Sequence, residues 1–416
     1  MKKQSEPNPI CVTERFKVLM LSWEFPPRVI GGIAAHVHDL SIAMNKLGID
    51  VTVVTCDFPG AKSYEDVDGV HVHRVDSYKF PTPNFASWVF MMNLNMQRYA
   101  IELVAEEVRR GQVILIHCHD WLVANAAISL KHIFRMPLLA TIHSTEYGRR
   151  GGIHSDYQRL IHQAEAWLTK EAWRVICCSN YMASQVRTIF NLPRTKIDII
   201  PNAVNATNFA PVPPSHLRTR FAEDDEKLVL YVGRLVYEKG VSVLIDSVSR
   251  VLQRVNAKFV IVGDGYMKDR LIDQAQRLGI SHKVCFTGFL NDQDVKSLYR
   301  VADVCVVPSL YEPFGIVALE AMASQTPVVA SGVGGLSEII EHDETGVSVY
   351  PSDPESLARG ILRLLEDDGY SSRLRRNGFL KVVNRYDWER VAGETGDVCN
   401  RVFTEYEKAS WKPWKV

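Results

Sequence analysis

The sequence predicts an α/β protein made of two doubly wound, Rossmann-like domains that face each other across a cleft. Two observations carry this expectation. Short apolar runs alternate with amphipathic helical segments, and the alternation stops once and then starts again. Many of the apolar runs are continuous, which is typical of a parallel sheet covered on both faces. With 416 residues the chain is also too long for one ordinary hydrophobic core.

The first half of the chain contains the first series of strands and helices. A helix is expected over residues 33–47, because apolar residues recur on one face from Ile33 to Met44 and Gly48 can end it. Strands are expected at residues 17–22, 51–55, 113–117, 138–142, 175–179 and 196–200, and further helices at residues 122–134 and 156–173.

A proline-rich segment, Pro211-Val-Pro-Pro214, interrupts the series and predicts a linker, because proline can continue neither a helix nor a central strand. The sequence therefore predicts domains at residues 1–205 and 206–385, followed by a terminal helix at 386–416. In the second domain, strands are expected at residues 228–232, 258–262, 283–287, 304–307 and 328–330.

Composition narrows the function class and the cellular compartment. Lys plus Arg and Asp plus Glu both total 48, and this balance argues against a nucleic-acid partner. None of the eight cysteines forms a C-x-x-C pair, and several lie in apolar runs, as expected for reduced core residues of a cytoplasmic protein. The first fifteen residues lack the apolar core of a signal peptide, and no apolar stretch is long enough for a membrane span. Peripheral contact with a membrane surface stays open.

Glycine-rich loops after predicted strands suggest anion binding. Gly31 and Gly32 open the first helix, where exposed amides and the helix dipole favour an anion, although a plain tight turn uses the same pair. A second such loop ends in Phe314, Gly315 and Ile316, at the start of a helix expected over residues 316–323.

Charged residues accompany these loops. Glu312 and Glu320 lie eight residues apart, and Glu320 stands among apolar residues, where it needs hydrogen bonds from sugar hydroxyls or from an arginine. Arg234 and Lys239 follow the first strand of the second half and suit a diphosphate, although a solvated surface pair would have the same sequence.

Together these segments resemble the retaining glycosyltransferases of family 4, which have the GT-B fold, and in particular its glycogen and starch synthase branch. The resemblance covers about residues 17–386. Its most specific element is Glu312-Pro-Phe-Gly-Ile-Val-Ala-Leu-Glu320, which matches the family's E-x7-E motif. Gly233, Arg234 and Lys239 stand at the expected distance upstream.

The resemblance implies a role for each residue. Arg234 and Lys239 would hold the leaving diphosphate, Glu312 would contact hydroxyls of the donor sugar, Glu320 would bind the ribose, and His143 would lie beside the anomeric carbon. The amides at the two glycine-rich helix starts would add to the phosphate contacts, and further loops would line the nucleotide. These donor-binding positions are Gly31, Gly32, Gly233, Asp264, Phe289, Leu290, Phe314, Gly315 and Ile316.

The two domains would bind different substrates. The first domain would bind the acceptor, the second would bind the nucleotide sugar, and the terminal helix would cross back to the first domain. Transfer would use a UDP-, ADP- or GDP-linked hexose, most simply glucose, and a glycan acceptor. No cofactor and no metal are expected, because side-chain cations and amides would neutralise the leaving group.

Two departures from the glycogen synthase pattern leave the identity of the acceptor open. Bacterial glycogen synthases have a Lys-x-Gly-Gly arrangement where this chain has Arg28-Val-Ile-Gly31-Gly32. The Phe314-Gly315 form of the motif is also shared by enzymes that make sucrose, glycolipids and exopolysaccharides. The segments Trp23-Glu-Phe-Pro-Pro27 and His117-Cys-His-Asp-Trp-Leu122 favour a glucan enzyme. Lipid, sucrose-like and exopolysaccharide acceptors remain alternatives.

Other functions are less consistent with the residues. A sugar-nucleotide 2-epimerase would not need the E-x7-E motif, and a non-catalytic binding protein would not need all the ionic residues. A nicotinamide dehydrogenase would show G-x-G-x-x-G after a strand, which is missing. Asp66-Val-Asp68 reads as a hairpin loop rather than a metal motif, and the three H-x-H pairs lack an obvious third zinc ligand.

Overall fold

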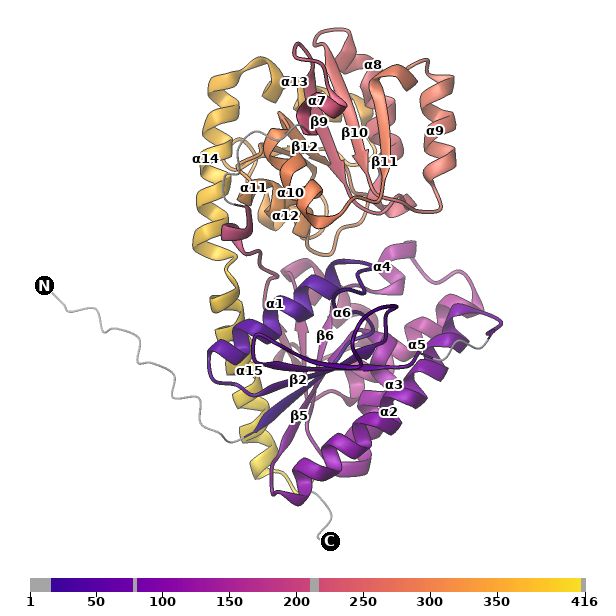
Figure 1. Ribbon diagram of the computed structural model, residues 1–416, viewed down its shortest axis with the longest axis vertical. Coiled ribbons are helices and arrows are strands. Elements are labelled where there is room, and N and C mark those ends of the chain that lie inside the picture. The colour runs from indigo at the N-terminus through magenta and orange to yellow at the C-terminus, as the bar shows by residue number, and fades with distance from the viewer. Residues whose placement is uncertain (1–15, 78–80, 210–216, 413–416) are drawn as a thin grey trace, which may run out of the picture. The chain divides into compact units, whose positions relative to one another are not determined.

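The computed structural model describes residues 16–77, 81–209 and 217–412 (Figure 1). Cys11 and the predicted linker Pro211–Pro214 lie outside the described residues. The chain divides into two compact units: unit 1 comprises Met1–Ile142, Gln163–Ile176 and Ala392–Val416, and unit 2 comprises His143–His162 and Cys177–Val391.

The first sheet has eight strands in the order β3-β4-β2-β1-β5-β6-β7-β8. The central strand β1 pairs in parallel with β2 and β5, and β3 pairs antiparallel with β4. The strands are β1 (Lys17–Leu21), β2 (Val51–Cys56), β3 (Tyr64–Val67), β4 (Val70–Val75), β5 (Ile114–His119), β6 (Leu138–Ile142), β7 (Arg174–Cys177) and β8 (Ile197–Ile199).

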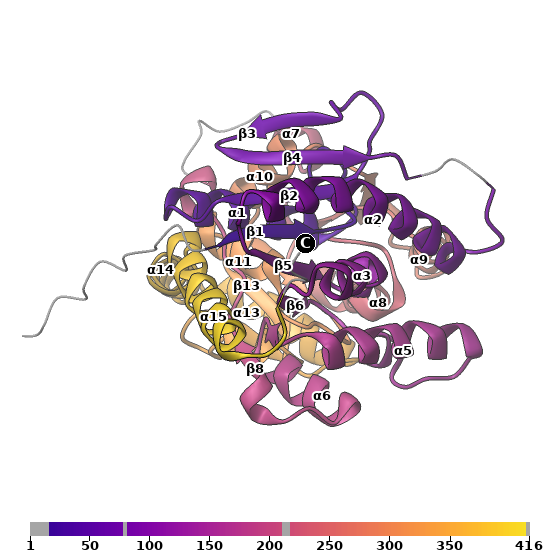
Figure 2. The same cartoon turned by 90° about the horizontal axis from the view of Figure 1, so that it is seen from below.

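Helices cover both faces of this sheet. In unit 1, α1 and the C-terminal part of α15 lie on one face, and α2 and α3 lie on the other (Figures 1 and 2). Phe403 of α15 packs against Phe16 with ring centroids 5.1 Å apart. The helices before the second sheet are α1 (Gly32–Lys46), α2 (Phe85–Arg109), α3 (Ala124–Phe134), α4 (Glu146–Arg150), α5 (Asp156–Glu171) and α6 (Asn180–Phe190), of which α4 and α6 belong to unit 2, and α15 (Trp388–Lys408) follows the second sheet.

The second sheet lies in unit 2 and has six parallel strands in the order β11-β10-β9-β12-β13-β14. The strands are β9 (Lys227–Val232), β10 (Ala257–Val262), β11 (Val284–Gly288), β12 (Val304–Val307), β13 (Val328–Ser331) and β14 (Val347–Val349). The helices are α7 (Leu217–Phe221), α8 (Val241–Leu252), α9 (Lys268–Arg277), α10 (Asp292–Val301), α11 (Ile316–Ala323), α12 (Leu336–Ile339), α13 (Pro354–Glu366) and α14 (Asp368–Arg385).

The core of unit 2 follows the two-residue period of its strands. Val229 and Tyr231 of β9, with Phe259 and Ile261 of β10, point to one face and pack with α8 in a single buried cluster. The intervening residues of the same strands are also buried, as expected for a parallel sheet with helices on both faces.

The sequence-based expectations for the elements are confirmed with small shifts at their ends. The strands β6 and β12 and the helix α11 have the predicted bounds. The predicted hairpin loop is also present, because Asp68 and Gly69 have φ angles of 50° and 87° between β3 and β4. The prediction did not include the strands β3 and β4, the helix α2 or the strand β14, and the three residues of β14 carry too little periodicity to be recognised.

The cysteines of the described residues are all free, and six of the seven are buried. Burial raises the pKa of the Cys56 and Cys399 thiols to about 12, so both stay protonated and unreactive in the folded chain. Among the helices that the structure describes, none combines the length and the hydropathy that crossing a membrane would require.

Gly240 illustrates how closely the loops after β9 and β12 approach each other. It has a φ of 65°, and a Cβ atom added to it would lie 2.0 Å from the carbonyl oxygen of Pro308. Gly279, also in unit 2, has nearly the same φ of 69°, but its Cβ atom would meet nothing within 4 Å. Comparing substitutions at the two glycines therefore separates the free-energy cost of the left-handed backbone from the cost of the close contact with Pro308.

We predict that Gly240→Ala destabilises the protein much more than Gly279→Ala. The left-handed backbone alone costs an alanine roughly 1–2 kcal/mol at either position. Displacing the Pro308 carbonyl adds about 1–3 kcal/mol at Gly240 only. Urea unfolding followed by circular dichroism measures both changes. Equal losses of stability for the two variants would show that the loops do not need this contact.

Candidate active site

The predicted donor residues of unit 2 lie in loops that follow neighbouring parallel strands. Arg234 follows β9, Asp264 follows β10, Phe289 follows β11 and Glu312 follows β12. Because the carboxyl ends of parallel strands meet at one edge of a sheet, these loops share the edge where α/β proteins bind ligands.

Backbone hydrogen bonds join these loops to one another. The amide of Gly263 donates to the carbonyl of Gly288 over 2.9 Å, and the amide of Leu235 donates to the carbonyl of Asp264 over 2.8 Å. Gly263 has a φ of 131°, and a Cβ atom there would lie 2.0 Å from the carbonyl oxygen of Gly233. Only glycine permits this approach, so the loops after β9, β10 and β11 form one continuous backbone surface.

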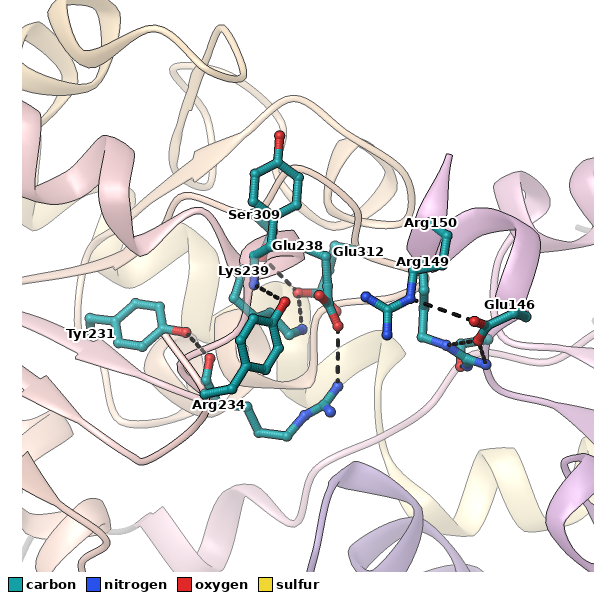
Figure 3. Close-up of polar contacts among 12 residues, drawn as sticks. Glu146, Arg149, Arg150, Tyr231, Arg234, Glu238, Lys239, Ser309 and Glu312 are labelled. Carbon is teal, nitrogen blue, oxygen red and sulfur yellow. Dashed lines mark hydrogen bonds and ion pairs between the residues drawn. The ribbon is translucent and has the colours of Figure 1, made fainter. Parts of the chain in front are cut away.

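Lys239 and Glu312 form the central ion pair of the site. The Lys239 Nζ lies 2.7 Å from Glu312 Oε2, and the Ser309 hydroxyl donates to the same oxygen over 2.9 Å (Figure 3). The two side chains are 21% and 11% exposed, so the pair is largely withdrawn from water. The structure thus brings together two residues that are 73 positions apart in the chain.

Backbone contacts hold the carboxylate loop in place. The amides of Leu310 and Tyr311 donate to the carbonyl of Glu238, the neighbour of Lys239, over 2.8 and 3.2 Å. The amide of Gly335 donates to the Glu312 carbonyl over 2.9 Å. The backbone hydrogen bonds of this loop and the ion pair with Lys239 therefore both fix the position of the Glu312 side chain.

Arg234 is held much less firmly than Lys239. Its guanidinium is 51% exposed and lies 3.8 Å from the Glu238 carboxylate (Figure 3). Such a long and exposed ion pair contributes little to stability, so the guanidinium can exchange its partner for a phosphate at small cost. The Arg234 backbone is fixed, because the buried Tyr231 hydroxyl donates to its carbonyl over 3.0 Å.

Glu320 has its own partner. It lies on α11 and accepts a hydrogen bond of 2.8 Å from the hydroxyl of Tyr299 on α10. Tyr299 is fully buried, and burial together with the nearby Glu320 charge raises its pKa well above the usual value. This hydroxyl therefore stays protonated and serves as a permanent donor to the carboxylate.

The start of α11 has the geometry of an anion site. Gly315 precedes the helix with a φ of 116°, and a Cβ atom there would lie 2.6 Å from Leu336 Cδ2. Glycine has no side chain that could cap the first amides of the helix. The amides after Gly315, beginning with Ile316, are thus oriented toward whatever lies beyond the helix start. Phe314, just before Gly315, is buried.

The remaining predicted residues follow the strands β11, β10 and β6. Phe289 is 77% exposed, and Leu290 follows it in the loop after β11. Asp264 accepts from its neighbour's amide over 2.7 Å and from Lys268 over 3.0 Å, and the hydrogen bond from Lys268 lowers its pKa. His143 directly follows β6 and is partly buried.

Gly31 and Gly32 lie in unit 1, at the start of α1. The amides of Ile30 and Gly31 donate to Glu24 Oε2 over 2.6 and 2.9 Å, and Glu24 is only 1% exposed. A carboxylate thus already occupies this helix start. A phosphate contact from Gly31 stays a prediction that requires Glu24 to give way. In the sequence, the sign of the contact between Glu24 and these amides is an acidic residue a few positions before a glycine pair.

Sequence reasoning also missed the contacts of the loop after His143. Thr145 caps α4 and donates its hydroxyl hydrogen to Gln185 over 2.7 Å, and the Tyr311 hydroxyl donates to the same amide oxygen over 3.0 Å. Within α4, Glu146 pairs with Arg149 and Arg150 (Figure 3). Tyr311, the neighbour of Glu312, is thereby tied to the segment that follows His143.

Two family models match the chain. "Glycosyltransferase Family 4" matches residues 30–208, and "Glycosyl transferases group 1" matches residues 216–381. An uncharacterized glycosyltransferase of Methanocaldococcus jannaschii is 42% identical over 92% of this chain and 97% of its own length. A glycogen synthase of Mycobacterium tuberculosis is 37% identical over 92% of this chain and 94% of its own length.

A solved structure agrees with these matches. Sucrose-phosphate synthase from Thermosynechococcus elongatus superimposes with a TM-score of 0.81 at 27% identity, over 94% of this chain and 100% of that one. With identities well above 30% over nearly the whole length, this chain belongs to the glycosyltransferases of family 4, on the GT-B fold and in the branch that contains glycogen synthases.

Proposed function

We propose that the protein moves a hexose, most simply glucose, from a nucleoside-diphosphate sugar to a glycan acceptor with retention of anomeric configuration. The observation that carries this proposal is the Lys239–Glu312 pair. It joins a cation suited to a phosphate and a carboxylate suited to a sugar hydroxyl at the ligand-binding edge of unit 2.

The cations would act on the leaving group. As the nucleoside diphosphate departs, negative charge grows on its terminal phosphate. Lys239, with two further N–H donors beyond the one given to Glu312, and Arg234, with its exposed guanidinium, would stabilise that charge. The amides of Gly315 and Ile316 at the start of α11 would add hydrogen bonds. This assignment requires no metal ion.

Glu312 would bind a hydroxyl of the donor sugar rather than attack its anomeric carbon. One of its oxygens already accepts from Lys239 and Ser309, which lowers the electron density available for attack. A double displacement would need a carboxylate directly beneath the anomeric carbon. We therefore favour front-face attack, with the leaving phosphate taking the proton of the acceptor hydroxyl.

The other predicted residues complete the proposal. Glu320, oriented by Tyr299, would bind the ribose hydroxyls, and His143 would lie beside the sugar. Asp264, Phe289 and Leu290 would line the nucleotide. A sucrose-like acceptor is the second candidate, favoured by the structural likeness to sucrose-phosphate synthase at 27% identity.

The reaction itself gives the first prediction. Purified protein supplied with UDP-, ADP- or GDP-glucose and with glycogen is expected to lengthen the glycan equally well with and without EDTA. Incorporation of labelled glucose into glycogen measures this directly. Loss of transfer on adding EDTA, restored by Mg²⁺, would contradict the assignment of charge neutralisation to Lys239 and Arg234.

Lys239→Ala is expected to lower kcat by about 10²–10³-fold, the usual effect of removing one donor that stabilises transition-state charge. A matched control exists in unit 2. Lys283 pairs with Glu226, also over 2.7 Å, with 22% and 8% of the two side chains exposed. Lys283→Ala should therefore cost similar stability but leave turnover unchanged. Equal turnover in the two variants would remove Lys239 from the reaction.

Glu312→Gln tests the role of the carboxylate. The amide can still accept from Ser309 and meet a sugar hydroxyl, so we expect turnover to fall by roughly a hundredfold and to remain measurable. Mass spectrometry of the unmodified protein with a slow fluorinated donor should show no covalent adduct. A glycosyl group attached to Glu312 would establish a double displacement and overturn the front-face proposal.

A further inference from the structure

Unit 1 carries an aromatic cluster to which the proposed function gives no role. Trp23 packs edge-on against Phe85 and Trp88 with ring centroids 5.9 and 6.4 Å apart, and Phe85 stacks on Trp88 at 5.6 Å. Trp121 and Phe85 form a further T-shaped pair with ring centroids 6.5 Å apart. We call these four residues the aromatic cluster.

The cluster lies at the ligand-binding edge of its own sheet. Trp23 follows β1, Phe85 and Trp88 form the first turn of α2 after β4, and Trp121 follows β5. Three post-strand segments thus contribute to one group of rings. Phe85 is 45% exposed, so the group is open to a ligand.

Arg28 completes the cluster. Its guanidinium carbon lies 5.4 Å from the Trp23 ring centroid and 5.6 Å from that of Trp88. The backbone amide of Arg28 donates to the Phe25 carbonyl over 2.9 Å, but its side chain has no hydrogen bond and no ion pair among the described residues. Its buried Nε and the buried indole nitrogen of Trp23 both lack an acceptor in that part of the chain.

A second arginine of unit 1 shows what a structural role looks like. Arg74 also lies over an aromatic ring, 5.9 Å from that of Phe25. It forms an ion pair with Glu65 and donates to the carbonyls of Lys62 and Pro26. Both arginines have a buried Nε without an acceptor, but the rest of the Arg28 guanidinium, unlike that of Arg74, has no carboxylate or carbonyl partner among the described residues. Leaving buried N–H donors unsatisfied is costly, so Arg28 is better explained by a ligand that supplies acceptors.

The chemistry of the cluster selects the ligand class. Flat aromatic faces favour the C–H faces of a sugar ring, and the Arg28 and Trp23 N–H groups can donate to its hydroxyl oxygens. A phosphate would also accept from the guanidinium but would require further converging donors beside it. The nearby amides of Ile30 and Gly31 are instead engaged by the Glu24 carboxylate, whose charge would repel an anion.

We infer that Arg28 and the aromatic cluster bind a neutral sugar unit of the glycan acceptor. This inference rests on the proposed function and names residues that select its acceptor. One sugar ring stacks on the exposed Phe85 and the neighbouring Trp88, and its hydroxyls accept hydrogen bonds from Arg28 and from the Trp23 indole.

The test uses maltoheptaose as the probe and the full-length protein without donor. Because the aromatic cluster contains three tryptophans, the glycan should change the intrinsic tryptophan fluorescence with saturation. Arg28→Gln and Phe85→Ala should each weaken binding by about tenfold and raise the KM for the glycan, while the KM for the nucleotide sugar changes less than about twofold. Arg28→Lys and Phe85→Tyr should recover part of the affinity, which separates ligand contact from misfolding.

Phe90→Ala is the matched control. Phe90 lies on the same helix and is 51% exposed, but it has no ring contact with the cluster. This variant should bind maltoheptaose like the unmodified protein. Unchanged maltoheptaose affinity in Arg28→Gln and Phe85→Ala would overturn the inference, as would tighter binding of glucose 6-phosphate than of maltose through Arg28.

The outcomes also separate this inference from the proposed function. Glycan binding that depends on Arg28, in a protein that hydrolyses no nucleotide sugar, would support the sugar site and reject the transfer reaction. Donor hydrolysis that depends on Lys239, with no effect of Arg28 or Phe85 on glycan affinity or KM, would support the transferase and reject the sugar site.

Discussion

The ion pair between Lys239 and Glu312 is the interaction on which the site of unit 2 depends. Each charge would be expensive to leave alone in a largely dry position, so each requires the other. Because one residue follows β9 and the other follows β12, the pair also fixes the distance between two loops. The backbone bonds from Leu310 and Tyr311 to the Glu238 carbonyl hold the same two loops together. The ion pair therefore neutralises two buried charges and fixes the distance between the two loops at the same time.

This constraint explains why a glycine stands at position 240. The loops after β9 and β12 can approach closely enough for the ion pair only if the chain turns without a Cβ atom at Gly240. In contrast, Arg234 is left with a long and exposed contact to Glu238. The site thus combines a largely buried ion pair with one exposed cation. In the proposed reaction the buried pair would position the sugar, and the exposed guanidinium would follow the departing phosphate.

Much of the fold could be predicted because strands and helices have different hydrophobic periods, and the E-x7-E motif led directly to Glu312 and to the loop that carries it. The three-residue strand β14 escaped because its pattern is too short. The partners Ser309, Tyr299 and Glu24 also escaped, because a hydrogen bond between distant residues leaves no local periodicity. The aromatic cluster was only half visible: Trp23 and Trp121 stood in segments that favour a glucan enzyme, but nothing in the sequence brought Phe85 and Trp88 beside them.

The part of α15 that begins at Ala392 belongs to unit 1, although the whole sheet of unit 2 precedes it. Phe403 packs on Phe16, Tyr406 lies 6.0 Å from Trp173, and Glu405 pairs with Arg174. A ribosome therefore makes the segment that closes the unit 1 core only after it has made the whole sheet of unit 2. Unit 2 can complete its sheet while still attached, whereas unit 1 must wait with part of its apolar surface uncovered. In this chain the N-terminal half is made first but finished last.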